Sequence, residues 1–165
     1  DANLEQFRRR ILILDQGIRA AVATIPPGNR KLLTYHDSWA YFAARYGMEV
    51  IGAAQPSDFS QPSVREVAGL IDQVKTLKLP AIFGSEVFPS DVLATIAREA
   101  GAAFVDRLRD DDLPGAPGGP RHSYLGLMVE NMEIMIPALG GAASPLFGFN
   151  TGPVLEGLSG TVYPQ

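Results

Sequence analysis

The sequence predicts an α/β fold in which a parallel four-stranded sheet is flanked by helices. Short apolar runs alternate with segments of helical periodicity, as in chains whose parallel strands are joined by crossover helices. The apolar runs lack the in/out alternation of half-exposed strands, which indicates that both faces of the sheet are covered. The helical segments also begin or end at capping residues such as Ser63, Ser123 and Gly101.

The first predicted element is a long helix. Its apolar residues are spaced three or four apart and form one stripe: Leu4, Phe7, Ile11, Leu14, Ile18, Val22 and Ile25. Pro26 and Pro27 end the helix, because proline lacks an amide donor and disfavours a helical residue before it. About 20 residues at about 1.5 Å each give a length of roughly 30 Å. Periodicity alone favours a helix that packs on the core.

Strands and helices then alternate. The predicted strands are 32–35, 50–53, 81–83 and 103–105, and the predicted helices are 38–46, 63–77, 90–100 and 123–139. Glu66 lies three residues after Ser63, which is the spacing of a capping box. A loop rich in Pro and Gly, residues 107–121, precedes the last helix. Residues 142–165 fit either an extended segment that packs on the domain or a tail that becomes ordered on a partner.

Composition excludes several classes of protein. The 14 Lys and Arg against 18 Asp and Glu give a net charge of −4 and a pI near 5.1, which argues against nucleic-acid binding. The chain has no Cys, so it has neither disulfides nor thiolate ligands, and a bound metal depends on His, Asp or Glu. No apolar run reaches the about 18 residues that span a bilayer. Charged residues make up 19%, below the average of about 25%.

Polar side chains follow each predicted strand at the edge of the sheet where ligands of α/β proteins gather. They are His36, Gln55, Glu86 and Asp106. An imidazole and two carboxylates form a mixed nitrogen and oxygen donor set that suits zinc, manganese or iron(II) better than calcium. His36, Glu86 and Asp106 are therefore candidate metal ligands.

Each candidate also has a purely structural interpretation. A histidine at a strand–helix junction commonly caps the helix, Glu86 could pair with Arg98 or Arg107, and Asp106 could pair with Arg109. The acidic run 110–112 is better interpreted as an exposed loop among arginines than as a cation site. His122 is interpreted as a surface residue. The phosphate-binding and hydrolase motifs G-x-x-x-x-G-K-[ST], G-x-G-x-x-G and G-x-S-x-G are absent from the sequence.

Five segments of the chain resemble, in order, the motifs of one known family. Thr34–Phe42 resembles an H-[DA]-A-F-x-Y-F segment, and Glu66–Val74 the helix that follows it. Ile82–Glu86 resembles an I-F-x-E strand end, Val105–Leu108 a T-D-x-L segment, and Ser123–Asn131 an S-Y-x-x-M-x-x-N helix. This ordered series resembles the metal-specific substrate-binding proteins of ABC importers, and the resemblance covers about residues 4 to 139.

The resemblance implies two α/β lobes joined by one long helix, with a divalent metal between them. Each lobe supplies two ligands, and those of this lobe map onto His36 and Asp106. Glu86 maps onto an acidic residue beside the ligands, which supports the site without bonding to the metal. His at position 36 favours Zn²⁺ over Mn²⁺, because imidazole suits zinc.

The resemblance also divides the chain into three parts. Residues 1–27 correspond to the C-terminal part of the inter-lobe helix, 28–140 to the C-terminal metal-binding lobe, and 141–165 to a Gly/Pro-rich tail without a family counterpart. We therefore expect a fragment or truncated product that lacks the N-terminal lobe. With only two ligands it should bind metal weakly or not at all.

The resulting hypothesis is one lobe of a solute-binding protein, not an enzyme. The protein would lie outside the cytoplasm, in the periplasm or as a membrane-anchored lipoprotein, and would pass Zn²⁺ or Mn²⁺ to an ABC permease. The missing N-terminal lobe is its other partner, and no nucleic acid is expected. Two alternatives remain open: a small metal-dependent hydrolase built on the same three candidate ligands, and a self-associating interaction module.

Overall fold

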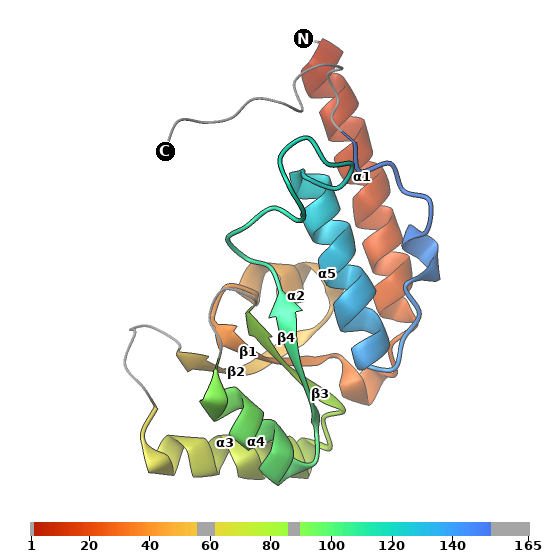
Figure 1. The fold of residues 1–165 in the computed structure, drawn as a ribbon. Helices are drawn as coiled ribbons and strands as arrows, with labels where there is room; N and C mark the ends of the chain where they lie inside the picture. Colours follow the sequence, from red (N-terminus) through yellow and green to blue (C-terminus); the bar gives the residue numbers. More distant parts are fainter. Residues whose placement is uncertain (1, 56–61, 86–89, 153–165) are drawn as a thin grey trace.

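The computed structural model describes residues 2–55, 62–85 and 90–152, which form three layers (Figure 1). The strands of the middle layer are β1 (Lys31–His36), β2 (Glu49–Gln55), β3 (Ala81–Ser85) and β4 (Ala103–Leu108). On one side lie α1 (Ala2–Ala23), α2 (Ala40–Tyr46) and α5 (Tyr124–Ala138), and on the other α3 (Val64–Leu77) and α4 (Asp91–Ala100). Two short 3-10 helices, η1 (Pro27–Asn29) and η2 (Ser144–Leu146), complete the described elements. The predicted α/β class is confirmed.

The central strands β1 and β3 are buried on both faces, as the absence of alternation predicts, whereas β2 and β4 are only partly covered. Leu32 and Phe83 face the core beneath α1, α2 and α5, whereas Leu33 and Ile82 face the core beneath α3 and α4. All four side chains are fully buried. Successive residues of a strand point to opposite faces, so one short apolar run contributes to both cores.

The prediction of one continuous four-stranded sheet is wrong in its pairing. β1 pairs in parallel with β2, and β3 in parallel with β4, as two separate two-stranded sheets. β1 and β3 lie against each other, but no hydrogen-bonded ladder joins their described residues. Apolar patterning predicts which strands are buried, because burial depends on side chains. Ladder formation depends on the backbone and leaves no such pattern.

All four strands extend beyond their predicted carboxyl ends, which moves the edge of the sheet. β1 continues to His36, β2 to Gln55, β3 to Ser85 and β4 to Leu108. In the β3–β4 pair the register shifts, because Phe83 lies opposite Val105 whereas Ser85 lies opposite Leu108. One extra residue of β4 is therefore accommodated at Gly84, as in a β-bulge.

The long helix α1 is core-packed along only part of the predicted stripe. Leu14, Ile18 and Val22 are buried, whereas Leu4 is 64% exposed and Ile11 is 37% exposed. Figure 1 shows the N-terminal turns of α1 extending past the end of α5. The predicted helix is confirmed, and in its N-terminal half only Phe7 of the predicted stripe packs against the core. No helix of the described segments is long and apolar enough to cross a membrane.

The segment after α5 returns along α1. The amide of Ala142 donates to Thr24 Oγ1 at 2.7 Å, and the Arg10 guanidinium donates to the carbonyl oxygen of Gly152 at 2.6 Å. Leu146, between these contacts, is buried in the core that α1 and α5 share. Residues 142–152 thus pack on the domain, which was one of the two possibilities left open for the tail; residues 153–165 lie outside the described segments.

Candidate functional site

The carboxyl end of β1 carries His36 into a small pocket. Its imidazole is half-buried, and its ring centroid lies 4.5 Å from that of Tyr35, edge to face. The Thr34 hydroxyl donates to the His36 carbonyl oxygen at 2.7 Å, which holds the strand end in place. On the neighbouring strand, the buried Gln55 lies opposite His36.

Residues from the ends of β1, β3 and β4 and from the loops that follow β1 and β4 form the walls of this pocket. They are Thr34, Tyr35, His36, Trp39, Phe83, Gly84, Ser85, Leu108 and Asp110. The cavity measures about 10 Å³. A space of that size admits about one water molecule or one ion. Among the lining residues, His36 and Asp110 are the strong metal donors.

Asp110 joins the ends of two strands through its carboxylate. Ser38 Oγ, just after β1, lies 3.4 Å from Asp110 Oδ2, and Ser85 Oγ, at the end of β3, lies 3.4 Å from Asp110 Oδ1. The side chain is half-buried, in contrast to the exposed Asp111 and Asp112. The interpretation of the acidic run as an exposed loop therefore holds for its last two residues and is wrong for Asp110.

Asp106 lies elsewhere. It is an exposed residue within β4 and is not part of the pocket wall that His36 and Asp110 share. β4 is three residues longer than predicted at its carboxyl end, because Leu108 is buried and pairs with Ser85. A Cβ on Gly84 would lie only 3.3 Å from the Asp106 Cα, so the missing side chain of Gly84 makes room for the bulged strand.

Glu86, the third candidate, lies outside the described residues. Within the described segments, no group of three or more His, Asp or Glu side chains is arranged to hold a metal ion. The structure therefore brings together two donors, His36 and Asp110, at the edge of the sheet. His122 is used locally, since its Nδ1 lies 3.2 Å from the carbonyl oxygen of Gly115 in its own loop.

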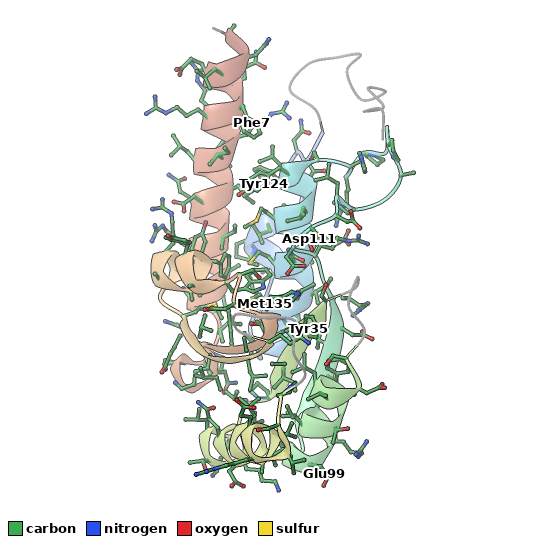
Figure 2. All side chains as sticks on the ribbon, turned by 90° about the vertical axis from the view of Figure 1, so that its left-hand side faces the viewer. Phe7, Tyr35, Glu99, Asp111, Tyr124 and Met135 are labelled. Carbon is green, nitrogen blue, oxygen red and sulfur yellow. The ribbon has the colours of Figure 1, made fainter. Side chains whose placement is uncertain are left out.

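The loop that carries Asp110 is anchored to α5 at both ends. At its beginning, the Arg109 guanidinium pairs with Glu130 at 2.9 Å. At its end, Ser123 Oγ accepts the amide of Gly126 at 3.0 Å and donates to the carbonyl oxygen of Thr151 at 2.6 Å. In the view of Figure 2, Asp111 of this loop lies at a height between Tyr124, at the start of α5, and Tyr35, near the end of β1.

A larger open groove adjoins the pocket between α2 and α5. Its volume is about 400 Å³, and its walls combine aromatic and apolar side chains with Arg45, Arg109 and Asp110. Tyr41, at its rim, is 94% exposed. The pocket therefore opens beside a surface broad enough to face another domain.

One edge of the groove is tied to α1 by Asp15. Its carboxylate accepts two hydrogen bonds from Arg45, at 2.8 and 3.0 Å, and one from Arg19 at 3.2 Å. The Arg45 hydrogen bonds are the largest cause of the lowered pKa of Asp15. Burial, followed by a hydrogen bond with Asp15, raises the pKa of Tyr46 to about 12. Tyr46 therefore stays neutral under physiological conditions.

Residues 1–138 match the zinc-uptake complex component A family, described as periplasmic. The chain belongs to this family. The resemblance predicted from the motifs is thereby confirmed.

Known relatives and solved structures agree with this family. The chain is 29% identical over 141 residues to the manganese-binding lipoprotein MntA of Bacillus subtilis, covering 83% of this chain and 46% of the relative. It is 28% identical over 140 residues to the zinc-binding protein TroA of Treponema pallidum, covering 82% and 45%. The solved structure of the periplasmic TroA superposes with a TM-score of 0.73 at 26% identity, covering 82% of this chain and 50% of that structure.

This member of the family spans about half the length of the relatives it matches. The relatives named above are metal-binding proteins, and neither is described as a hydrolase. The comparisons thus give the hydrolase alternative no support.

Proposed function

We propose that this chain forms the C-terminal lobe of a solute-binding protein that captures Zn²⁺ or Mn²⁺ for import by an ABC permease. The carrying observation is the convergence of His36 and Asp110 on one ion-sized pocket at the sheet edge. Family membership supplies the context, because relatives that match this half of their length bind manganese or zinc. In this proposal the metal is cargo and the protein is not an enzyme.

Two donors do not complete a coordination sphere, so the proposal requires a second lobe. Zn²⁺ in proteins takes at least three or four ligands. The remaining donors would come from an N-terminal lobe that closes over the pocket and the adjoining groove. The 165-residue chain by itself is expected to bind metal weakly. Glu86 remains a predicted supporting residue at the same edge.

The donor chemistry fits both metals. Imidazole and carboxylate bind zinc and manganese, and the imidazole of His36 shifts the balance toward zinc. We propose an extracytoplasmic location, in the periplasm or on a lipid anchor, since the family is described as periplasmic and MntA as a lipoprotein.

The proposal predicts which substitutions abolish metal capture. In the two-lobe protein, His36→Ala and Asp110→Asn should each weaken Zn²⁺ binding about 100-fold or more, since even groups that only support ligands contribute 10–100-fold. Asp106→Asn is the matched control: it removes a carboxylate four residues away that is outside the pocket. Calorimetric titration of the three variants and the wild type with Zn²⁺ and with Mn²⁺ measures the dissociation constants.

The outcomes separate the two aspartates. If Asp106→Asn loses metal binding and Asp110→Asn binds as the wild type does, the metal ligand is Asp106, as the motif resemblance implies. Tight, stoichiometric binding that survives His36→Ala would reject the proposed site altogether.

A further inference from the structure

We propose that Asn131 is the positioning residue that fixes Asp110 at the ion-sized pocket. The proposal rests on the function proposed above, because it assigns a role toward the same site. Asn131 does not line the ion-sized pocket. It acts on the residue immediately before Asp110.

The amide of Asn131 holds both backbone groups of Arg109. Its Oδ1 accepts the Arg109 N–H at 2.9 Å, and its Nδ2 donates to the Arg109 carbonyl oxygen at 2.7 Å. Arg109 follows the last residue of β4, so this pair of bonds continues the support that the strand ladder provides up to Leu108. Because both its N–H and its carbonyl oxygen are hydrogen-bonded, the backbone of Arg109 has little freedom to rotate. This fixes the direction in which the chain continues from β4 to Asp110.

Neither helix formation nor core packing explains an asparagine at this position. Asn131 is 0% exposed, and its neighbours on the buried face of α5, Met132 and Met135, are equally buried. Burying an amide is unfavourable unless its donor and its acceptor are both satisfied. Asparagine provides one of each on a short side chain. Aspartate would lose the donor, and an apolar residue would lose both.

The preceding residue of α5 reinforces the same point of the loop. Glu130 pairs with the Arg109 guanidinium at 2.9 Å, so consecutive residues of α5 hold the side chain and the backbone of Arg109. One residue further, the Asp110 carboxylate reaches Ser38 and Ser85. A continuous set of contacts thus runs from α5 through Arg109 to the pocket.

The test is a double-mutant cycle in the two-lobe protein, titrated with Zn²⁺. Asn131→Ala should weaken binding about 10–100-fold, the range for groups that orient a metal ligand. In the Asp110→Asn background the same substitution should have almost no further effect, because the residue through which it acts is gone. Asn29→Ala is the matched control, since Asn29 also bonds a backbone carbonyl, that of Leu139, outside the ion-sized pocket.

Each result has a defined meaning. A wild-type dissociation constant in Asn131→Ala, or an equal loss in both backgrounds, overturns the positioning role. If Asn131→Ala does not fold, Asn131→Asp is tested in the same double-mutant cycle, because it keeps the acceptor oxygen and removes the N–H donor. Unchanged binding in Asp110→Asn alone refutes the proposed donor pair and the inference together. A loss in Asp110→Asn with none in Asn131→Ala refutes only the inference.

Discussion

At the scale of single residues, Asp15 connects the long helix to the lobe. It lies on α1, its side chain is only 14% exposed, and it bonds Arg45 on α2 as well as Arg19 on its own helix. The Arg19 guanidinium also lies 5.6 Å from the ring centroid of Tyr46. One carboxylate therefore organises a cluster of charges beside the groove, and its ionisation should be visible in the stability of the fold.

The sign of this effect follows from the lowered pKa of Asp15, whose ordinary value is 3.8. The folded state binds the proton more weakly than the unfolded state, so Asp15 stabilises the fold above its unfolded pKa. That contribution is lost as the pH falls through the folded pKa. Asp15→Asn should lower the urea midpoint modestly at about pH 7, and the difference from wild type should vanish toward about pH 2.

Urea denaturation at steps of pH measures this difference. Asp72→Asn on α3 is a suitable control, because Asp72 is exposed. A difference for Asp15→Asn that stays constant across the pH range would show that its carboxylate does not stabilise the fold through its charge.

The sequence predicts the position of one candidate metal donor of the pocket, His36, but not that of the other, Asp110. His36 follows an apolar run directly, so its place at the strand end could be predicted. The position of Asp110 could not be predicted, because Asp106 and Arg107, the two residues before the last of β4, are charged and exposed and do not look like part of a buried strand. The available signal was Leu108, an apolar residue whose burial extends β4 and moves the edge to Asp110.

At the scale of elements, the start of α5 shows how a glycine fixes a loop. A Cβ on Gly126 would lie 2.0 Å from the carbonyl oxygen of Arg121, a distance that backbone atoms cannot tolerate. The close approach allows the loop that carries Asp110 to close tightly onto α5. Gly69, within α3, has nothing within 4 Å of the same position.

The two glycines should respond in opposite directions to the same substitution. Gly126→Ala should destabilise by about 1–3 kcal/mol or more through overpacking. Gly69→Ala should stabilise by up to about 1 kcal/mol, because alanine is the better helix former. Urea denaturation of both variants measures the free energies of unfolding. Equal stabilisation in both would mean that the contact between Arg121 and Gly126 is absent in solution.

The starts of α3, α4 and α5 are the features that the sequence predicts best. Ser63 Oγ accepts the Glu66 amide at 3.3 Å, and the Glu66 carboxylate accepts the Ser63 amide at 2.7 Å, which is the capping box expected from their spacing. Ser90 and Ser123 cap α4 and α5 with their hydroxyl groups alone, which accept the amides of Leu93 and Gly126. Caps are local contacts between residues three apart, so the sequence carries them directly. The separation of β1 and β3 into different ladders is a long-range property and was missed.

At the scale of the whole molecule, the N-terminal half of α1 carries apolar side chains into solvent. Leu4, Leu12 and Ile13 are each more than half exposed. Groups of exposed apolar residues commonly mark contact surfaces. In the proposed two-lobe protein this half of α1 is the surface on which the other lobe would rest. That arrangement also accounts for the low fraction of charged residues.

Residues 142–152 of the same chain pack along α1 from Arg10 to Thr24, just beyond its C-terminal end. Leu146 packs so closely that a Cβ on Gly17 would lie 2.8 Å from its Cδ2. Further along, the carbonyl oxygens of Thr151 and Gly152 are held by Ser123 and Arg10. This segment therefore links α1 to the start of α5 and makes the long helix and the lobe one unit.

The contribution of this segment to stability can be measured at Leu146, its larger buried side chain. Leu146 is 2% exposed, so Leu146→Ala should lower the free energy of unfolding by about 2–5 kcal/mol, the range for large-to-small changes in a core. Phe147, the next residue, is 71% exposed. Phe147→Ala should therefore change the free energy of unfolding by no more than about 0.5 kcal/mol. Urea denaturation of both variants provides the comparison. If α1 and the lobe form one unit, Leu146→Ala unfolds in a single transition at lower urea. Equal stabilities for the two variants would show that the segment does not pack on α1 in solution.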